Sequence, residues 1–402
     1  MSDSISRRAF LLRSGAIGCS LAASPLVTPV SFAAMPGENR LVVVILRGGM
    51  DGLDVVQPYG DSLLGQLRPT LKVGPDSGAL DLDGYFALHP SFEALLPLWN
   101  AGEFGFVHAV STPYRDKRSH FDGQDLLEAG TTSLGEGARD GWLNRLLQVN
   151  PNFDAHTAFA IGRGDLKLLD GPAQVSNWFP QTQLGLSSQA ERLLELITES
   201  DPVIHAALAE AQGLAEDTSQ QSATLQDIRK AAAQQKGGAH ISIAEFAAEQ
   251  LSKQARIAAF SLDGWDTHRG QARELPRALT RLKDTILTLK SKTRDAVWQK
   301  TTIVALTEFG RTVRENGTAG TDHGTGGLMI LAGGAVRGGR VHGDWPGLAE
   351  RDLYDGRDLL PTRDVRANLA WLMRGLYGLD RSVLEDTVFP GLELGRDPGL
   401  LL

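Results

Sequence analysis

The sequence is almost free of cysteine: Cys19 is the only one in 402 residues. A chain with one thiol cannot form an internal disulfide, so its stability must come from a hydrophobic core. Aromatic residues make up only 6% of the chain. Beyond the N-terminal segment, no stretch is apolar over the roughly 20 residues that a membrane-spanning helix needs. These absences argue against a disulfide-stapled fold and against a stable membrane span.

Positive charge is also in deficit, because the formal net charge is −8 at pH 7. The first 33 residues hold Arg7, Arg8 and Arg13 against the single acid Asp3, so the rest of the chain is more acidic still. An acidic surface repels the phosphates of nucleic acids and of anionic membranes. We therefore expect neither of them as a partner.

The N-terminus has the pattern of a twin-arginine export signal. The pair Arg7-Arg8 is followed by large apolar residues, then by a weakly apolar stretch over 16–27. Small residues at Ala33 and Ala34 suit a signal peptidase. This pattern predicts a signal peptide over 1–33, the twin-arginine translocase as a partner, and a periplasmic or secreted location.

Two other interpretations of this segment remain open. The arginine pair could begin an ordinary amphipathic helix. In that case the charged pair, the apolar stretch and the small residues would follow one another in the order of a signal peptide only by chance. Cys19 could carry a lipid, but it follows Arg13 too closely for a full apolar segment to precede it.

Strand and helix patterns alternate over residues 34–402. Continuous apolar runs, typical of strands buried on both faces, lie at 41–46, 104–110, 255–262, 301–306 and 328–331. Helical patterns lie at 92–99, after a capping Ser119, at 275–289 and at 364–377. The Ala-, Gln- and Glu-rich segment 189–250 reads as a helical insertion. The prediction is a single α/β domain, a three-layer sandwich with a mostly parallel central sheet.

Acidic residues or histidines follow the predicted strands. In open α/β sheets, ligands bind beyond the carboxyl ends of the strands. One such residue alone is usually a helix cap or a packed side chain, but capping does not require histidine. Carboxylates and imidazoles together suit zinc, manganese or iron, so the pattern predicts a divalent metal site. The groups after the strands include Asp51, His120, Asp263, Asp266, His268, Glu308, Asp322 and His323.

The other histidines lack this setting and are expected to be structural: His89, His108, His156, His205, His240 and His342. Two arginines, Arg47 and Arg311, also stand at strand ends. A guanidinium there could hold a phosphate or sulfate oxyanion with two hydrogen bonds, or it could neutralise its acidic neighbours.

Several motifs resemble one known family, the twin-arginine-exported domain-of-unknown-function family numbered 1501, which itself resembles the alkaline phosphatase-sulfatase superfamily. They are LRGGMDGL at 46–53, SHFDGQ at 119–124, GWDTH at 264–268, TEFGR at 307–311 and GTDHG at 320–324. The resemblance implies an alkaline-phosphatase-like sheet between helices, one or two divalent metals, and transfer or hydrolysis of phosphate or sulfate esters.

The resemblance also implies roles for particular residues. Ser119, at a helix N-terminus, stands where the superfamily has its nucleophile, and Arg47, His120 and Arg311 would contact substrate. The implied metal ligands are Asp51, Asp263 or Asp266 with His268, Glu308, Asp322 and His323.

Two departures stand out. Phe309 replaces the histidine expected after the fourth strand, which removes a ligand of a second metal, and Ser119 lacks the flanking pattern of sulfatases.

The sequence thus leads to two functional hypotheses. The first is an exported hydrolase or transferase that uses zinc, manganese or calcium on a phosphate ester, or less favourably a sulfate ester. The second is a catalytically inactive protein of the same fold that binds an extracellular polymer or partner, and Phe309 favours it. Fold alone cannot separate the two.

Overall fold

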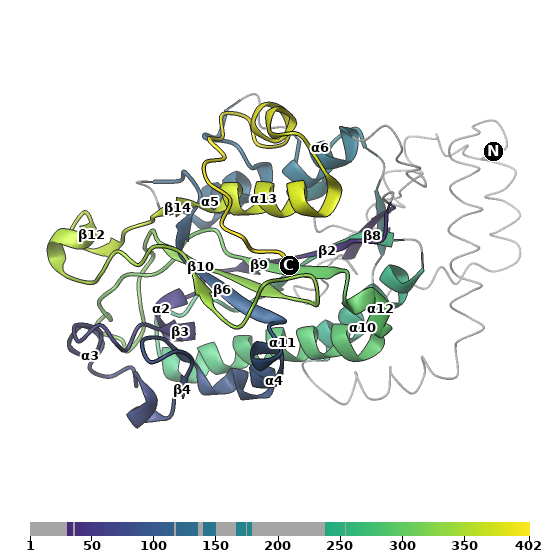
Figure 1. Ribbon diagram of the computed structural model, residues 1–402. Coiled ribbons are helices and arrows are strands. Elements are labelled where there is room, and N and C mark those ends of the chain that lie inside the picture. The colour runs from purple at the N-terminus through teal and green to yellow at the C-terminus, as the bar shows by residue number, and fades with distance from the viewer. Residues whose placement is uncertain are drawn as a thin grey trace, which may run out of the picture.

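The computed structural model describes residues 30–34, 37–115, 118–135, 140–149, 166–173, 175–178, 238–253 and 255–402. A central sheet lies between two layers of helices (Figure 1). Within the described residues, no helix has the length and apolar character to span a membrane. The predicted signal peptide lies outside them up to residue 29, as does the insertion up to residue 237.

The sheet is built around β2 (Arg40–Arg47), which lies between β8 (Ala255–Asp263) and β9 (Thr301–Leu306) and runs parallel to both. Alternate side chains of β2 enter two separate cores. Val42, Val44 and Leu46 face one core, and Leu41, Val43 and Ile45 face the other. Burial on both faces explains the unbroken apolar run, and these predicted strands are confirmed.

Within the described residues the sheet has nine strands, in the order β11-β6-β10-β9-β2-β8-β1-β7, with β14 also paired to β6. The further strands are β1 (Val30–Ala34), β6 (Phe104–Ser111), β7 (Ser176–Trp178), β10 (Gly327–Ala332), β11 (Val341–His342) and β14 (Arg363–Asp364). All but β10 and β1 run in the same direction, so the sheet is mixed and mostly parallel.

The predicted strand at 328–331 forms as β10, but it is antiparallel to both of its neighbours. The connection from β9 to β10 contains no helix, and a parallel crossover needs a longer connection, usually a helix. Because β10 reverses direction, β6 on its far side again runs with β9. The carboxyl ends of β2, β6, β8 and β9 therefore meet at one edge of the sheet.

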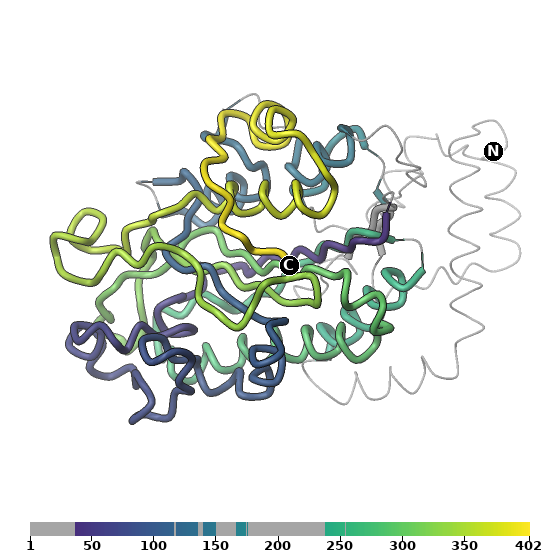
Figure 2. Tube along the Cα trace, viewed as in Figure 1, coloured from purple at the N-terminus to yellow at the C-terminus, as the bar shows by residue number. Residues whose placement is uncertain are grey.

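Helices cover both faces. One face carries α5 (His120–Ala129), α6 (Trp142–Gln148) and α13 (Val365–Tyr377), and the other carries α4 (Leu96–Asn100), α10 (Ala239–Ser252) and α11 (Gln271–Lys292) (Figure 1). The tube view shows the same two layers of helices on opposite sides of the sheet (Figure 2). This arrangement confirms the α/β sandwich, and α10 is the described part of the predicted insertion.

The helix expected at 92–99 is split. A 3-10 helix covers Pro90–Leu95, and α4 begins at Leu96 with Pro97 in its first turn. Proline has no backbone N–H to donate and is best accommodated in the first turn of an α-helix, which fits a new helix that begins at Leu96. The cap expected at Ser119 is confirmed, because its side chain accepts a hydrogen bond from Asp122 N–H.

The strand β1 overlaps the segment predicted as a signal peptide. It pairs antiparallel with β8 on one side and β7 on the other. Cleavage near Ala33 would remove most of β1 and leave one edge of β8 unpaired. Export and cleavage therefore bear directly on the architecture of this side of the sheet.

Candidate metal centre

Three histidines surround the carboxylate of Asp266 at the carboxyl edge of the sheet. Asp266 and His268 follow β8, His120 opens α5 after β6, and His323 lies in the loop between β9 and β10. The Asp266 oxygens lie 3.5 Å from His120 Nε2, 3.1 Å from His268 Nε2 and 3.6 Å from His323 Nε2. The Nε2 atoms of His268 and His323 are 2.8 Å apart. Four candidate ligands from three separate segments thus converge.

Each of these rings is held from behind through its other nitrogen. His120 Nδ1 lies 2.8 Å from Glu308 Oε1, His268 Nδ1 lies 3.0 Å from Asp322 Oδ1, and His323 Nδ1 lies 2.7 Å from the carbonyl of Arg118. Ionised carboxylates and carbonyls only accept hydrogen bonds, so Nδ1 carries the hydrogen in every ring. In the neutral imidazole, the lone pair is then on Nε2, directed at Asp266.

The residues fit a metal ion. The ligand atoms of His120, Asp266 and His323 all lie within 4.8 Å of one another. Zinc bonds of about 2.0–2.2 Å place tetrahedral ligand atoms about 3.3–3.6 Å apart, close to the separations observed. His120 Nε2 is buried and makes no hydrogen bond within the described residues. Histidines that bind a metal usually donate their other ring N–H to a carboxylate or a backbone carbonyl, as these do.

Charge within the centre is closely coupled. The carboxylates of Asp266 and Glu308 raise the pKa of His120 to about 9. Burial alone would raise the pKa of Asp266, but the neighbouring His120, His323 and Arg311 outweigh it and lower that pKa. Without a metal, the centre therefore holds a proton on His120 and a firmly ionised Asp266.

Glu308 lies behind His120 rather than beside the other ligands. Its side chain is fully buried, and its Oε1 accepts hydrogen bonds from Gly48 N–H at 2.9 Å and from Gln124 at 3.1 Å as well as from His120. Burial raises the pKa of Glu308, but these hydrogen bonds lower it overall. The structure therefore places Glu308 as the acceptor that orients His120.

The two predicted oxyanion-binding arginines already have protein partners. Arg47 donates to Gln124 Oε1 at 2.7 Å and pairs with the buried Glu128 at 2.7 Å, which completes a chain from Glu128 to Glu308. Arg311 is buried, donates to the carbonyls of Gly48, Gly49, Trp265 and Thr321, and pairs with Asp266 at 2.6 Å. Of the two alternatives, the geometry favours neutralising and positioning roles.

Asp51 and Asp263 do not join the centre. Asp51 is buried, receives two hydrogen bonds from Arg68 at 2.8 and 3.0 Å, and caps the short helix α2 (Gly52–Val55). Asp263 is exposed, and its backbone carbonyl accepts from Arg281. Asp322 contacts His268 Nδ1 and so stands behind that ring.

Two further residues lie next to the histidines. Ser119 is the N-cap of α5, adjacent to His120, and its N–H donates to the hydroxyl of Tyr114 at 2.8 Å. The ring of Phe309 stacks on His120, with centroids 5.1 Å apart, and lies 4.9 Å from His323. An apolar ring therefore lies against two histidines of the centre, at the position where the resemblance predicts a further histidine.

Several contributing residues escaped prediction. Gln124 lies one helical turn after His120, a spacing that a search of the same helix face would have found. Arg118 contributes its backbone carbonyl, which leaves no mark in a sequence. Its φ of 49° is rare for a residue other than glycine or asparagine, and such strain gathers at functional sites.

Two of the histidines expected to be structural, His108 and His342, contact backbone carbonyls and not the metal centre. His108 is buried, its Nε2 donates to the carbonyl of Val56, and burial lowers its pKa to about 4. His342 Nε2 lies 3.0 Å from the carbonyl of Arg337. His156 and His205 lie outside the described residues.

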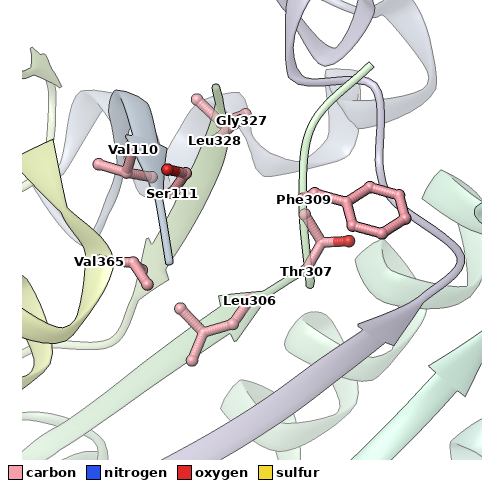
Figure 3. Close-up of a pocket in the computed structure, with 8 residues that line it drawn as sticks. All are labelled: Val110, Ser111, Leu306, Thr307, Phe309, Gly327, Leu328 and Val365. Carbon is pink, nitrogen blue, oxygen red and sulfur yellow. The ribbon is translucent and has the colours of Figure 1, made fainter. Parts of the chain in front are cut away.

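A small pocket opens between the carboxyl ends of β6 and β9 (Figure 3). Its lining is mainly aliphatic: Val110, Ser111, Leu306, Thr307, Phe309, Gly327, Leu328 and Val365. The Phe309 ring points away from Ser111 and Val365 (Figure 3). Because Phe309 also stacks on His120, it borders both the pocket and the metal centre.

The fold and the site together describe an α/β protein with a histidine- and aspartate-lined centre at the carboxyl edge of a mostly parallel sheet. The family model described as "Protein of unknown function (DUF1501)" matches residues 102–388, most of the chain, and this protein belongs to that family. No curated protein and no solved structure matches the chain. The matched range includes every residue of the centre but begins after β2 and Asp51.

Proposed function

We propose that this protein is an exported, metal-dependent hydrolase or transferase that acts on a phosphate ester, with a sulfate ester as the less favoured substrate. The observation that carries the proposal is the arrangement of His120, His268 and His323. Each ring donates from Nδ1 to an acceptor behind it and directs Nε2 at the carboxylate of Asp266. When the three rings are neutral, their Nε2 lone pairs and the Asp266 carboxylate together form a donor set for a cation.

Zinc suits this donor set best. Imidazole nitrogens and carboxylate oxygens are typical zinc ligands, and a site held by His120, Asp266 and His323 would leave a fourth position open to substrate. Manganese also accepts such ligands, whereas calcium binds through six to eight oxygens. We therefore rank zinc first, manganese second and calcium last.

Chemistry would proceed at the exposed side of the centre. A bound metal lowers the pKa of a coordinated oxygen and neutralises charge on an ester. Ser119 is the candidate nucleophile, because it adjoins His120 at the N-terminus of α5, where the helix dipole favours an anion. Arg311 and Glu308 hold Asp266 and His120 in place, so their contribution is positional.

Elemental analysis of protein purified from the periplasm tests the metal directly. We expect about one zinc per chain, lost in Asp266→Asn and His323→Ala. His342→Ala is the matched control, since that histidine lies away from the centre, and it should keep its metal. Metal-free wild-type protein that also fails to take up zinc, manganese or calcium would exclude a metal centre.

Activity is tested separately with a panel of phosphate and sulfate monoesters and diesters. We expect turnover of a phosphate ester by the zinc-loaded protein, lost in Ser119→Ala while zinc content stays unchanged. Retention of full activity in Ser119→Ala would assign the nucleophile to another group, such as a water molecule.

The second candidate is a catalytically inactive protein that binds an extracellular polymer or partner. Phe309 favours it, because the buried ring lies against two of the three histidines and removes a ligand of a second metal. Zinc binding without turnover of any ester, together with retention of one polysaccharide in a binding screen, would support this function over the first.

Export through the twin-arginine translocase is part of the proposal. Its sequence basis is the Arg7-Arg8 pair, which lies outside the described residues. Replacement of both arginines by lysine should leave the protein in the cytoplasm, as cell fractionation would show. Because this route carries folded cargo, it suits a protein that acquires its metal before export.

A further inference from the structure

Two of the three segments that carry candidate metal ligands, the loop with Asp266 and His268 and the loop with His323, are joined by one buried amide. This amide is the side chain of Gln271 at the start of α11. Its Oε1 accepts from the hydroxyl of Thr267 at 2.9 Å and from that of Thr321 at 2.7 Å. Thr267 stands between Asp266 and His268, and Thr321 directly precedes Asp322 and His323. One oxygen therefore contacts both loops, one residue from Asp266 and His268 and two residues from His323.

The other end of the amide is fixed as firmly. Gln271 Nε2 donates to Asp51 Oδ2 at 2.7 Å and to Asp54 Oδ2 at 2.8 Å. Asp51 is paired with Arg68, so a flipped amide would face its oxygen to that carboxylate. Both donors and both acceptor positions of Gln271 are in use, and the side chain is 0% exposed. With all four hydrogen bonds formed, the Gln271 amide is held in a single orientation.

Backbone contacts add to this connection. Thr321 N–H donates to the carbonyl of Thr267 at 3.2 Å, and Gln271 N–H donates to that of Ala319 at 2.9 Å. Gly320 lies so close to the other loop that a Cβ there would approach Thr267 O and His268 to within 2.4 Å. The loops therefore meet with no room between them.

We infer that Gln271 is a positioning residue of the metal centre. Through Thr267 and Thr321 it sets the distance between the Asp266–His268 pair and His323, and through Asp51 and Asp54 it ties this distance to the sheet. The inference rests on the proposed metal-dependent function and assigns a role in it to a residue that touches neither metal nor substrate. It also gives Asp51 a role, as the acceptor that holds this amide in place.

The test compares zinc affinity with stability. Gln271→Met removes all four hydrogen bonds at similar volume, whereas Thr267→Val and Thr321→Val each remove one hydroxyl and leave the amide in place. The matched control is Thr285→Val, since Thr285 is a buried threonine of α11 whose hydroxyl donates to Arg281 O away from the centre. Zinc affinity is measured by competition with a chromophoric chelator, and Co²⁺ absorption reports ligand geometry.

We expect zinc to bind about 10–100-fold more weakly to Thr267→Val combined with Thr321→Val, as for other groups that orient metal ligands. The Co²⁺ spectrum should change, and the melting temperature should stay near that of Thr285→Val. If Gln271→Met does not fold, the zinc affinity and Co²⁺ spectrum of the threonine variants test the role of Gln271. Wild-type zinc affinity and spectrum in them would overturn this role alone. Wild-type protein that binds no zinc would overturn the proposed function, and this role with it.

Discussion

Two charged clusters lie at the same edge of the sheet, and they differ in how far their hydrogen bonds are satisfied. In the Asp51 cluster, one carboxylate receives bonds from Arg68, Gln271, Thr321 and Leu53 N–H, all buried. In the metal centre, three ring nitrogens face Asp266, whose side chain is 47% exposed. The same residue types thus form a closed structural ion pair in one place and an open set of ligands in the other.

The difference teaches that the partner of an aspartate decides its role. Asp51 and Asp266 both follow a strand of the parallel core. Asp51 has no acceptor position left for a metal, because Arg68, Gln271 and Leu53 N–H together donate four hydrogen bonds to its carboxylate. Asp266 also has an arginine, Arg311, but through one nitrogen only, so it still faces the histidines.

The largest expected effect is on the closed cluster. Arg68→Met leaves Asp51 buried without a counterion, and it also removes donors to the carbonyls of Thr312 and Val313. Breaking a buried ion pair costs about 3–5 kcal/mol. Urea denaturation should show a loss of this size in the free energy of unfolding. Arg351→Met, at a side chain 87% exposed, should change it by less than about 0.5 kcal/mol. Equal, small losses in both variants would show that the clusters do not differ in this way.

The next effect concerns proton competition at the open centre. His120 must lose its proton to bind zinc, and its pKa is raised to about 9 in the absence of metal. Below that pKa, the zinc dissociation constant should fall about tenfold for each pH unit, or about 1.4 kcal/mol. Competition titrations at about pH 7 and about pH 8 measure this change. A constant independent of pH, with no proton release in calorimetry, would contradict it.

The smallest effect concerns the stability of the metal-free protein. The folded-state pKa of His120, about 9, lies above its ordinary value of 6.5. Its contribution is therefore fully present below about pH 6.5 and is lost as the pH rises to about 9. Because the ring is partly exposed, we expect about 1 kcal/mol. Urea denaturation of wild-type protein and of His120→Gln across this range should show the decline only in the former.

The elements of the core could be predicted because their signals are local. The runs that became β2, β6, β8 and β9 are apolar on both faces, and Ser119 caps α5 through a bond three residues away. The direction of β10 was not predictable in the same way. It depends on how the chain between β9 and β10 folds over the sheet, and that chain contains no helix.

The site was predictable in part. Asp266, His268 and His323 were expected as ligands and do converge, since the strands before them set where their loops begin. His120 was expected to contact substrate, yet its Nε2 lies among the candidate ligands. Glu308 and Asp322 were expected to bind metal and stand behind histidines instead. Residue type and strand position do not distinguish a ligand from the group that orients it.

The sequence by itself determined the strands, the edge at which they end, and the supply of carboxylates and imidazoles there, because periodicity and residue type act over a few residues. Only the tertiary structure decided which carboxylate is open and which is closed. Arg68 reaches Asp51 from 17 residues along the chain, and Gln271 reaches it from 220. Such partners are chosen by packing, through burial and hydrogen-bond geometry, and these exist only once the chain has folded.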